Sequence, residues 1–342
     1  MTKAAELAKI GEVLTNSQIG GRRNIIINGS QIVAQRATQV TSISSEGYKT
    51  VDRFKWTMDS TSAVFTHSQS TDVPTGEGFA NSFKVDVTTA DTSLASGNQT
   101  RFEQRIEGQD VQQLAKGTSN AKKVTLSFWV KAYQTGTYVV NLQDVDNSRL
   151  IAKTYTVNSS ATWEYKTITF DGDTTGTFNN DNGLSLNVLW YLGAGSDYTS
   201  GTLATSWESL TNANRAAGQT VDIATSTSNY WQITGIQLEV GEQATPFEHR
   251  SFGEELALCQ RYFMKSSCDL KAFTNSSSDS GARAMNIFFP TVMRGTPSMS
   301  ASPDAGTISF SNRLKDSVAV SIGGSVNATT FLSGGYTADS EL

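Results

Sequence analysis

Hydrophobic and polar residues alternate along much of the chain, and this alternation predicts short β-strands. In residues 124–130 the apolar positions Val124, Leu126, Phe128 and Val130 fall on one face of an extended segment. Similar segments recur at a spacing of roughly 8–15 residues, separated by turns rich in Gly, Ser, Thr and Asn: 25–34 (with a turn or bulge signal near Asn28-Gly29), 50–57, 62–67, 79–87, 101–107, 136–142, 150–157, 163–170 and 184–192. This spacing favours an all-β sandwich or barrel over βαβ units.

Residues 228–240 change phase in the middle of a predicted strand. Trp231 and Ile233 alternate with polar residues, and Ile236 and Leu238 then alternate in the opposite phase. A strand changes phase only by gaining an extra residue. Because Gly235 lies at the change, the pattern predicts a β-bulge there.

After residue 250 the apolar spacing becomes helical. Ser251, with Glu254 three residues later, has the form of a capping box. An apolar stripe at helical spacing follows, formed by Phe252, Leu256, Cys259 and Phe263. We predict a linking helix within residues 251–265 and expect its stripe to pack between copies of the chain.

The predicted strand 101–107 carries charges on one face. Arg101, Glu103, Arg105 and Glu107 lie opposite the apolar residues of the same strand. Since Glu103 is flanked by two arginines, we interpret this face as solvated and ion-paired rather than catalytic.

The two histidines, His67 and His249, lie in no nucleophile or metal-ligand motif, and no G-x-S-x-G elbow is present. We therefore expect no enzymatic activity.

The connection 193–228 is too long for an ordinary loop in a compact domain, and long loops of this kind are often functional. It contains Tyr198 and Trp207, and the strand before it ends in Trp190 and Tyr191. Aromatic faces stack on sugar rings, so these four residues are the candidate glycan-binding site. The alternative is that Trp190 or Tyr191 fills the core, since alternation directs one of the two inward.

An acidic stretch begins at Asp171 and Asp173 and continues through residues 179–183, Asn-Asn-Asp-Asn-Gly. Oxygen ligands of this kind suit Ca²⁺, but the spacing departs from that of an EF-hand. A solvated hairpin turn is the other interpretation. We expect no metal and no cofactor, with calcium as the alternative.

Composition limits the remaining classes. The chain has 342 residues, which is long enough for two domains. Its net charge is −5, and it contains no basic cluster that would bind nucleic acid. No 18-residue apolar run and no signal-peptide h-region are present. Two cysteines, Cys259 and Cys268, are too few for a disulfide framework, so we expect a reduced protein made in a cytoplasm.

The two ends of the chain differ from the middle. Residues 3–15 predict a short helix with Leu7, Ile10 and Leu14 on one face. This segment is too short to be stable alone, so residues 1–23 are either an anchor to a partner or a frayed terminus. Residues 266–342 predict a small β-module with few large apolar residues, which association between copies would stabilise.

Two segments carry a resemblance to a known family. ITGIQLEVGEQATPFEHRSFGEELALCQRYF, ending at Phe263, resembles the end of the jelly-roll, carbohydrate-binding-like domain of virion-fibre proteins in tailed bacteriophages, cyanophages among them. RNIIINGSQIVAQRATQVTS, followed by YKTVDRFKW, resembles its opening. The resemblance implies a jelly-roll β-sandwich over residues 24–250 and a homotrimeric structural protein of the virion.

Three functions fit this resemblance. The first is a tail fibre that attaches by its N-terminus and recognises a polysaccharide on the host surface. The second is a head fibre or capsid decoration protein. The third is a tailspike enzyme that degrades polysaccharide, which is usually a longer β-helix with repeats. We expect the tail fibre, located in the virion, with no nucleic-acid partner and no membrane insertion.

Overall fold

The computed structural model describes residue 3 and residues 23–266, 283–303, 307–323 and 334–342. The chain forms two compact units, residues 1–250 and 251–342. No helix in these described ranges is long and apolar enough to span a bilayer. The predicted anchor residues Leu7, Ile10 and Leu14 lie outside the described residues.

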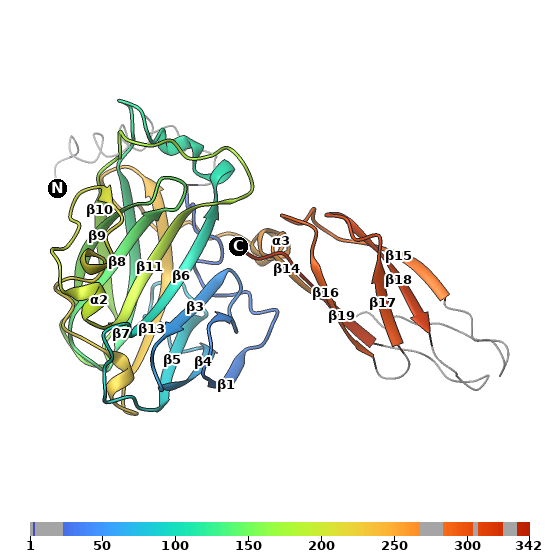
Figure 1. The fold of residues 1–342 in the computed structure, drawn as a ribbon, viewed down its shortest axis with the longest axis horizontal. Helices are drawn as coiled ribbons and strands as arrows, with labels where there is room; N and C mark the ends of the chain where they lie inside the picture. The colour runs from blue at the N-terminus through green and yellow to red at the C-terminus, as the bar shows by residue number, and fades with distance from the viewer. Residues whose placement is uncertain (1–2, 4–22, 267–282, 304–306, 324–333) are drawn as a thin grey trace. The chain divides into compact units, whose positions relative to one another are not determined.

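The N-terminal unit is a sandwich of two antiparallel sheets (Figure 1). One sheet has six strands in the order β1 (Gln39–Ile43), β4 (Val64–Ser70), β5 (Ser82–Thr89), β13 (Tyr230–Val240), β7 (Val124–Ala132) and β10 (Glu164–Phe170). The other has seven, in the order β12 (Glu208–Ser209), β9 (Arg149–Val157), β8 (Gly136–Asp144), β11 (Leu184–Ala194), β6 (Gln99–Glu107), β3 (Phe54–Asp59) and β2 (Gly47–Tyr48). The predicted all-β, jelly-roll-like architecture is confirmed.

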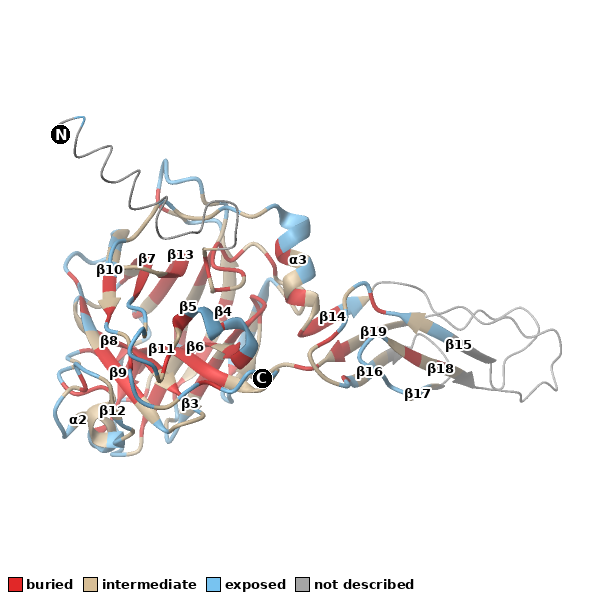
Figure 2. Ribbon diagram, turned by 90° about the horizontal axis from the view of Figure 1, so that it is seen from above, coloured by how far each residue is buried: buried red, intermediate tan, exposed pale blue. Residues whose placement is uncertain are grey.

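Short helical turns connect the strands of this unit: η1 (Gly108–Asp110), η2 (Gln112–Leu114), α2 (Ser196–Thr199), η3 (Asn212–Asn214) and η4 (Ile223–Thr225). The core lies between the sheets, where alternate residues of the facing strands are buried (Figure 2). Aromatic rings fill its centre, and Trp190 packs edge-on against Phe128 at a centroid distance of 5.8 Å. Edge-to-face pairs add about 0.5–1.5 kcal/mol to the burial of their area.

The predicted bulge in β13 is confirmed. Thr234 is opposite Trp129 and Gln237 is opposite Ser127, so three residues of β13 span two of β7. Gly235 has a φ of +62°, a left-handed conformation that glycine adopts without steric cost. The extra residue lets Ile233 and Ile236 both lie fully buried in the core.

The opening segment 25–34 is interrupted at Asn28, where the sequence predicts a turn or bulge, and it forms no regular strand. Asn28 has a φ of +60°, which breaks the extended conformation. The segment instead pairs locally with β13 beyond the bulge. The Ile25 amide donates to the Leu238 carbonyl at 2.9 Å, and the Asn24 side chain donates to the Ile236 carbonyl at 2.9 Å.

The long connection 193–228 folds over the outer face of the seven-stranded sheet. Ala204 and Ala216 pack there against Val139 and Tyr191 in a second small apolar cluster. The Ala152 amide donates to the Ala204 carbonyl at 2.7 Å. The solvated-face interpretation of strand 101–107 is therefore wrong in part, because Glu103 and Glu107 are buried.

The C-terminal unit begins with α3 (Phe252–Gln260), followed by two small sheets. One sheet has the order β14 (Phe263–Ser266), β19 (Gly334–Asp339) and β16 (Ser298–Pro303). The other has the order β15 (Arg283–Phe288), β18 (Ser317–Gly323) and β17 (Thr307–Ser311). The capping box is confirmed, since both reciprocal hydrogen bonds between Ser251 and Glu254 are present.

The predicted helical stripe is wrong at Phe263, whereas its packing between copies of the chain stays a prediction. Phe263 lies in β14, opposite Asp339, and not on the helix. Cys259 and Phe263 are both buried. Phe252, which is 57 % exposed, and the half-buried Leu256 are the members of the stripe that remain accessible.

Candidate functional site

The site begins with a tryptophan on the polar face of a core strand. In β7 the buried residues Leu126 and Phe128 alternate with Ser127 and Trp129, so Trp129 points out of the six-stranded sheet. Tyr165 of β10 lies directly opposite Trp129. Their ring centroids are 5.3 Å apart and the rings are inclined at 46°. Strand pairing therefore places two adjacent aromatic rings on the outer face.

Three further rings come from the segments that flank β5 and β13. Phe79 lies 5.1 Å from Phe247 and 5.4 Å from His249, measured between ring centroids. Phe247 and His249 are themselves 4.9 Å apart. The bulge makes room for this cluster, because a Cβ on Gly235 would lie 2.6 Å from Cζ of Phe79.

Together these residues line an aromatic groove of about 470 Å³. Its lining consists of Glu77, Phe79, Ser127, Trp129, Tyr165, Gly235, Ala244, Thr245, Pro246, Phe247 and His249. Tyr165 is 45 % exposed, and the other carbon rings are half-buried. Exposed aromatic surface bordered by polar groups is typical of a ligand site.

A hydrogen-bonded polar cluster lies two residues along β7 from Trp129. Asp72 accepts from Lys131 Nζ at 2.7 Å, from Trp163 Nε1 at 3.1 Å and from Gln232 Nε2 at 3.3 Å. Partial burial alone would raise the pKa of Asp72, but these three donors hold it below its usual value. The carboxylate is therefore fixed in place and ionised on the same sheet face as the groove.

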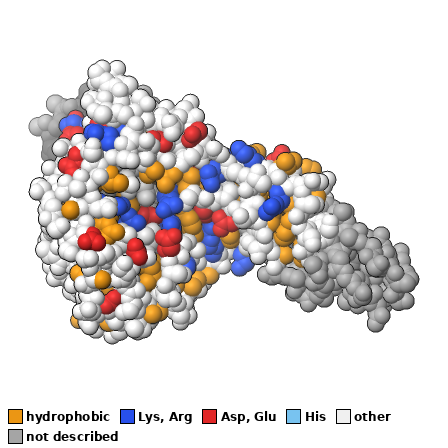
Figure 3. All heavy atoms as spheres, viewed as in Figure 1, with side chains coloured by type: hydrophobic (Ala, Val, Ile, Leu, Met, Phe, Trp, Pro, Cys, Tyr) orange, Lys and Arg blue, Asp and Glu red, His pale blue; other side chains and the backbone are white. Residues whose placement is uncertain are grey.

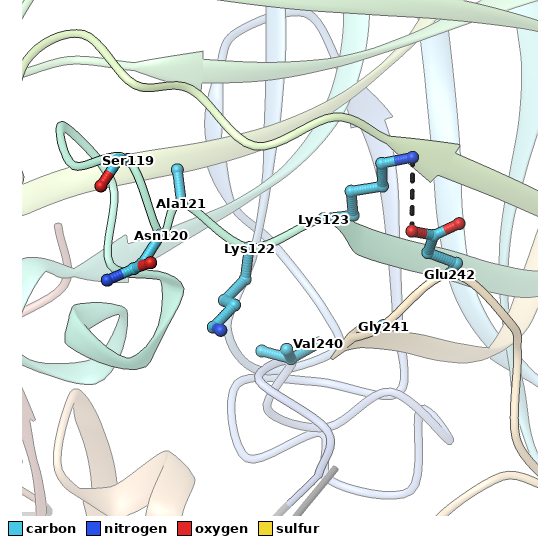
Figure 4. Close-up of a pocket in the computed structure, with 8 residues that line it drawn as sticks. All are labelled: Ser119, Asn120, Ala121, Lys122, Lys123, Val240, Gly241 and Glu242. Atoms are coloured by element: carbon cyan, nitrogen blue, oxygen red, sulfur yellow. Dashed lines mark ion pairs between the residues drawn. The ribbon is translucent and has the colours of Figure 1, made fainter. Parts of the chain in front are cut away.

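A second hollow, also of about 470 Å³, lies between residues 119–123 and residues 240–242 (Figure 4). Lys123 and Glu242 face each other across it at 3.4 Å. Its eight lining residues include no aromatic side chain, so it offers no ring for stacking. The aromatic groove is the better candidate for a sugar.

The structure does not bring the four predicted aromatic residues together on one accessible face. Trp190 and Tyr191 are fully buried. Trp190 lies in the sandwich core, and Tyr191 lies beneath the connection 193–228. Trp207 is half-buried, and its Nε1 donates to the Asp171 carbonyl at 2.7 Å. Tyr198 packs on Tyr191 with a centroid distance of 6.4 Å. Only Tyr198 and Trp207 retain any exposed surface, and neither lines the groove.

The acidic stretch does not form a metal site in the part of the chain that the structure describes, where no three His, Cys, Asp or Glu side chains converge. Asp173 instead accepts from Arg149 Nε at 2.6 Å and pairs with Lys116 at 3.1 Å. The solvated-turn interpretation also fails for Asp173, which is 5 % exposed. Side-chain cations neutralise this carboxylate.

The sequence contained a signal for the groove. Trp129 alternates with the apolar residues of the predicted strand 124–130 and so lies in its polar phase. A large aromatic residue in a polar phase must lie on the surface or under another segment. Phe79, Phe247 and His249 gave no comparable signal, since they lie in irregular segments that only the fold brings together.

No family model and no curated protein matches this sequence. Among solved structures, the enzymatically active domain of bacteriophage CBA120 tailspike protein 4 aligns at 12% identity over 64% of this chain, with a TM-score of 0.33. The chain spans only 21% of that structure. CBM4 aligns at 13% identity over 63% of this chain and 98% of its own, with a TM-score of 0.32.

A family 11 carbohydrate-binding module from Clostridium thermocellum, solved with a mixed-linked tetrasaccharide, aligns at 10% identity over 61% of this chain and 99% of its own, with a TM-score of 0.30. These are distant similarities to carbohydrate-binding modules and to one phage tailspike domain. They transfer neither a ligand nor an activity to this chain.

Proposed function

We propose that the N-terminal unit binds a neutral glycan in the aromatic groove, and that the chain is a tail-fibre protein of a phage virion. The observation that carries the binding role is the row of accessible rings on one sheet face, Trp129 with Tyr165 and Phe79 with Phe247. Sugar rings present apolar C–H faces that stack on such surfaces, and the hydroxyl groups at their edges require polar neighbours.

A neutral ligand agrees with the charge of the groove. Glu77 is the one carboxylate among its described lining residues, and His249 is the one basic side chain. The lining therefore offers no fixed charge pair that would select an ionic ligand. The exposed side chains of Glu77 and His249 supply polar groups for hydrogen bonding with sugar hydroxyls.

The same lining supports binding without catalysis. Glycoside hydrolysis requires in most families two carboxyl groups that flank the bond, and the groove contains one. The other histidine of the chain, His67, is buried, and burial lowers its pKa to about 3. His67 is therefore neutral and packs between Trp56 and Phe83 as a core residue.

The virion role is supported by the two segments that resemble fibre proteins, which lie at the opening and the end of the sandwich. In this proposal residues 1–23 attach the chain to the particle, and copies of the chain form a homotrimer.

A capsid decoration or head-fibre protein is the alternative, and imaging labelled particles separates the two. A polysaccharide-degrading tailspike is the third alternative, and release of reducing sugar from capsule would support it.

The binding test uses the purified full chain on an array of neutral bacterial glycans. Trp129→Ala should lower the affinity for the bound glycan by about tenfold, the equivalent of roughly 1.4 kcal/mol. Tyr133→Ala is the matched control, since Tyr133 is 48 % exposed but lies about 13 Å further along the chain direction of β7. Thermal unfolding of each variant measures whether the fold is retained.

Equal loss of affinity in both variants, or none in Trp129→Ala, would reject the groove. If the wild-type chain binds no neutral glycan, the binding proposal itself fails. Tyr165→Ala provides a second variant in case Trp129→Ala does not fold, because Tyr165 is more exposed than its half-buried neighbour.

A further inference from the structure

The outer face of the seven-stranded sheet carries a second set of polar residues, on the other side of the sandwich from the groove. Cross-strand pairing places Arg101 of β6 opposite Tyr191 of β11, and Arg105 opposite Asn187. On β8, Asn141 is opposite Leu189 in the same sheet. Figure 3 shows basic, acidic and hydrophobic side chains gathered over the middle of this face.

Arg215 lies in the connection 193–228, which covers part of this face. Its Nη2 donates to Gln143 Oε1 at 3.2 Å, and its carbonyl accepts from Asn141 Nδ2 at 2.9 Å. Arg101 and Arg215 both approach the ring of Tyr191, at 5.6 Å and 5.9 Å from its centroid. Arg215 also lies 5.8 Å from the ring of Tyr198. Two guanidinium groups thus converge on one aromatic surface.

The charges on this face do not balance locally. Glu103 pairs with Arg105 at 3.1 Å and with Arg101 at 4.0 Å. Arg215 forms no ion pair with any described residue, and its side chain donates to the neutral amide oxygens of Asn212 and Gln143. Burial lowers the pKa of Arg215, and the nearby charge of Arg101 acts in the same direction. An anion at this position would offset the free-energy cost of burying the Arg215 charge.

Several buried polar atoms here have no hydrogen-bond partner among the described residues: Arg101 Nε, Arg215 Nε, Asn141 Oδ1 and Asn187 Oδ1. Asn141 and Asn187 are 1 % and 5 % exposed. Buried polar groups in folded proteins are nearly always paired with protein, water or a ligand. These four atoms on one face therefore have unused capacity for a water molecule or a ligand.

We propose that this arginine cluster, formed by Arg101, Asn141, Asn187, Tyr198 and Arg215, binds the carboxylate of an acidic saccharide. A guanidinium presents parallel N–H donors that match a carboxylate in a bidentate pair. The half-exposed Tyr198 offers a ring on which the sugar stacks. The amide oxygens of Asn141 and Asn187, whose nitrogens already donate within the protein, can accept from the sugar hydroxyl groups. Arg215 and Arg101 are partly exposed, so the ligand reaches them from solvent.

The test is titration calorimetry of the full chain with trigalacturonate, trimannuronate and sialyllactose, and with galactotriose and sodium sulfate as references. At least one acidic saccharide should bind at least tenfold more tightly than galactotriose, and added salt should weaken it. Arg215→Gln should remove this preference, while Arg313→Gln, an exposed arginine of the C-terminal unit, should leave it unchanged.

Trp129→Ala distinguishes this site from the groove, because it should leave acidic-saccharide binding intact. Binding of none of the three acidic probes, equal binding by sulfate, or full affinity in Arg215→Gln would each overturn the proposal. If Arg215→Gln does not fold, Arg215→Lys keeps the charge without the bidentate geometry, and unchanged affinity in that folded variant would also overturn it.

Discussion

At the scale of single residues, Lys116 has the role that a bound cation would have in the acidic stretch. Its Nζ lies 2.5 Å from Asp144 and 3.1 Å from Asp173, and donates to the carbonyls of Thr175 and Gly176 at 2.8 Å each. All three side chains are at least nine-tenths buried. Breaking such a network by removing one partner leaves an uncompensated buried charge.

This network predicts how stability responds to acid. Burial alone would raise the pKa of Asp173, but hydrogen bonds from Arg149 and the Thr175 amide, with the Lys116 ammonium, hold it below its usual value. Asp173 therefore contributes stability above its unfolded pKa of about 3.9, and this contribution is lost as the pH falls through the lower folded pKa.

Asp173→Asn should accordingly be less stable than the wild-type chain at pH 7, and the difference should narrow as the pH falls below about 4. Urea unfolding of both proteins from pH 7 to pH 3 measures the difference. A free-energy gap that stays constant across this range would show that the ionisation of Asp173 does not stabilise the fold.

At the scale of secondary-structure elements, the bulge in β13 connects the core to the groove. The extra residue keeps Ile233 and Ile236 both in the core, and Gly235, without a Cβ, leaves space for the Phe79 ring on the opposite face. One local irregularity thus satisfies the packing of two faces.

Gly235→Ala should reduce both stability and glycan affinity. Alanine at a φ of +62° is strained by roughly 1–2 kcal/mol, and its Cβ displaces Phe79. Gly218→Ala is a matched control, since Gly218 has a φ of +83° but no atom near its Cβ position. If both variants lose stability equally and both keep full glycan affinity, Gly235 matters for backbone conformation alone.

The elements themselves were largely predictable from the sequence, whereas the site was not. Alternation identified the core phase of β7, and the phase change identified Gly235, because both depend on neighbours close in sequence. Burial of Tyr191 depends on the segment near Ala204 and Ala216 folding back over the sheet. That packing is tertiary and leaves no period in the sequence, so the sequence pattern does not reveal that Tyr191 is buried.

At the scale of the whole molecule, the C-terminal unit exposes apolar residues that a monomeric domain usually buries. Phe288 is 75 % exposed, Leu314 is 57 % exposed and Val292 is 56 % exposed. Phe288 is opposite Ser317 in the β15–β18 pair, and the Leu314 amide donates to the Ser317 carbonyl at 2.8 Å. Phe288 and Leu314 are therefore both backbone neighbours of Ser317, and these two exposed residues are named the apolar patch.

The proposed homotrimer would cover this patch, and Phe288→Asp tests it. A charge placed at an apolar contact between copies is disfavoured by several kcal/mol unless it is paired, so light scattering should show a shift from trimer toward monomer. Leu94→Asp is the matched control, since Leu94 is 47 % exposed in the N-terminal unit.

Linked sites bind a surface with higher avidity than one site. The Phe288→Asp chain should therefore bind cells far more weakly while its single-site glycan affinity stays unchanged. A wild-type chain that is monomeric at all concentrations, or a Phe288→Asp chain that remains trimeric, would remove this patch from the assembly.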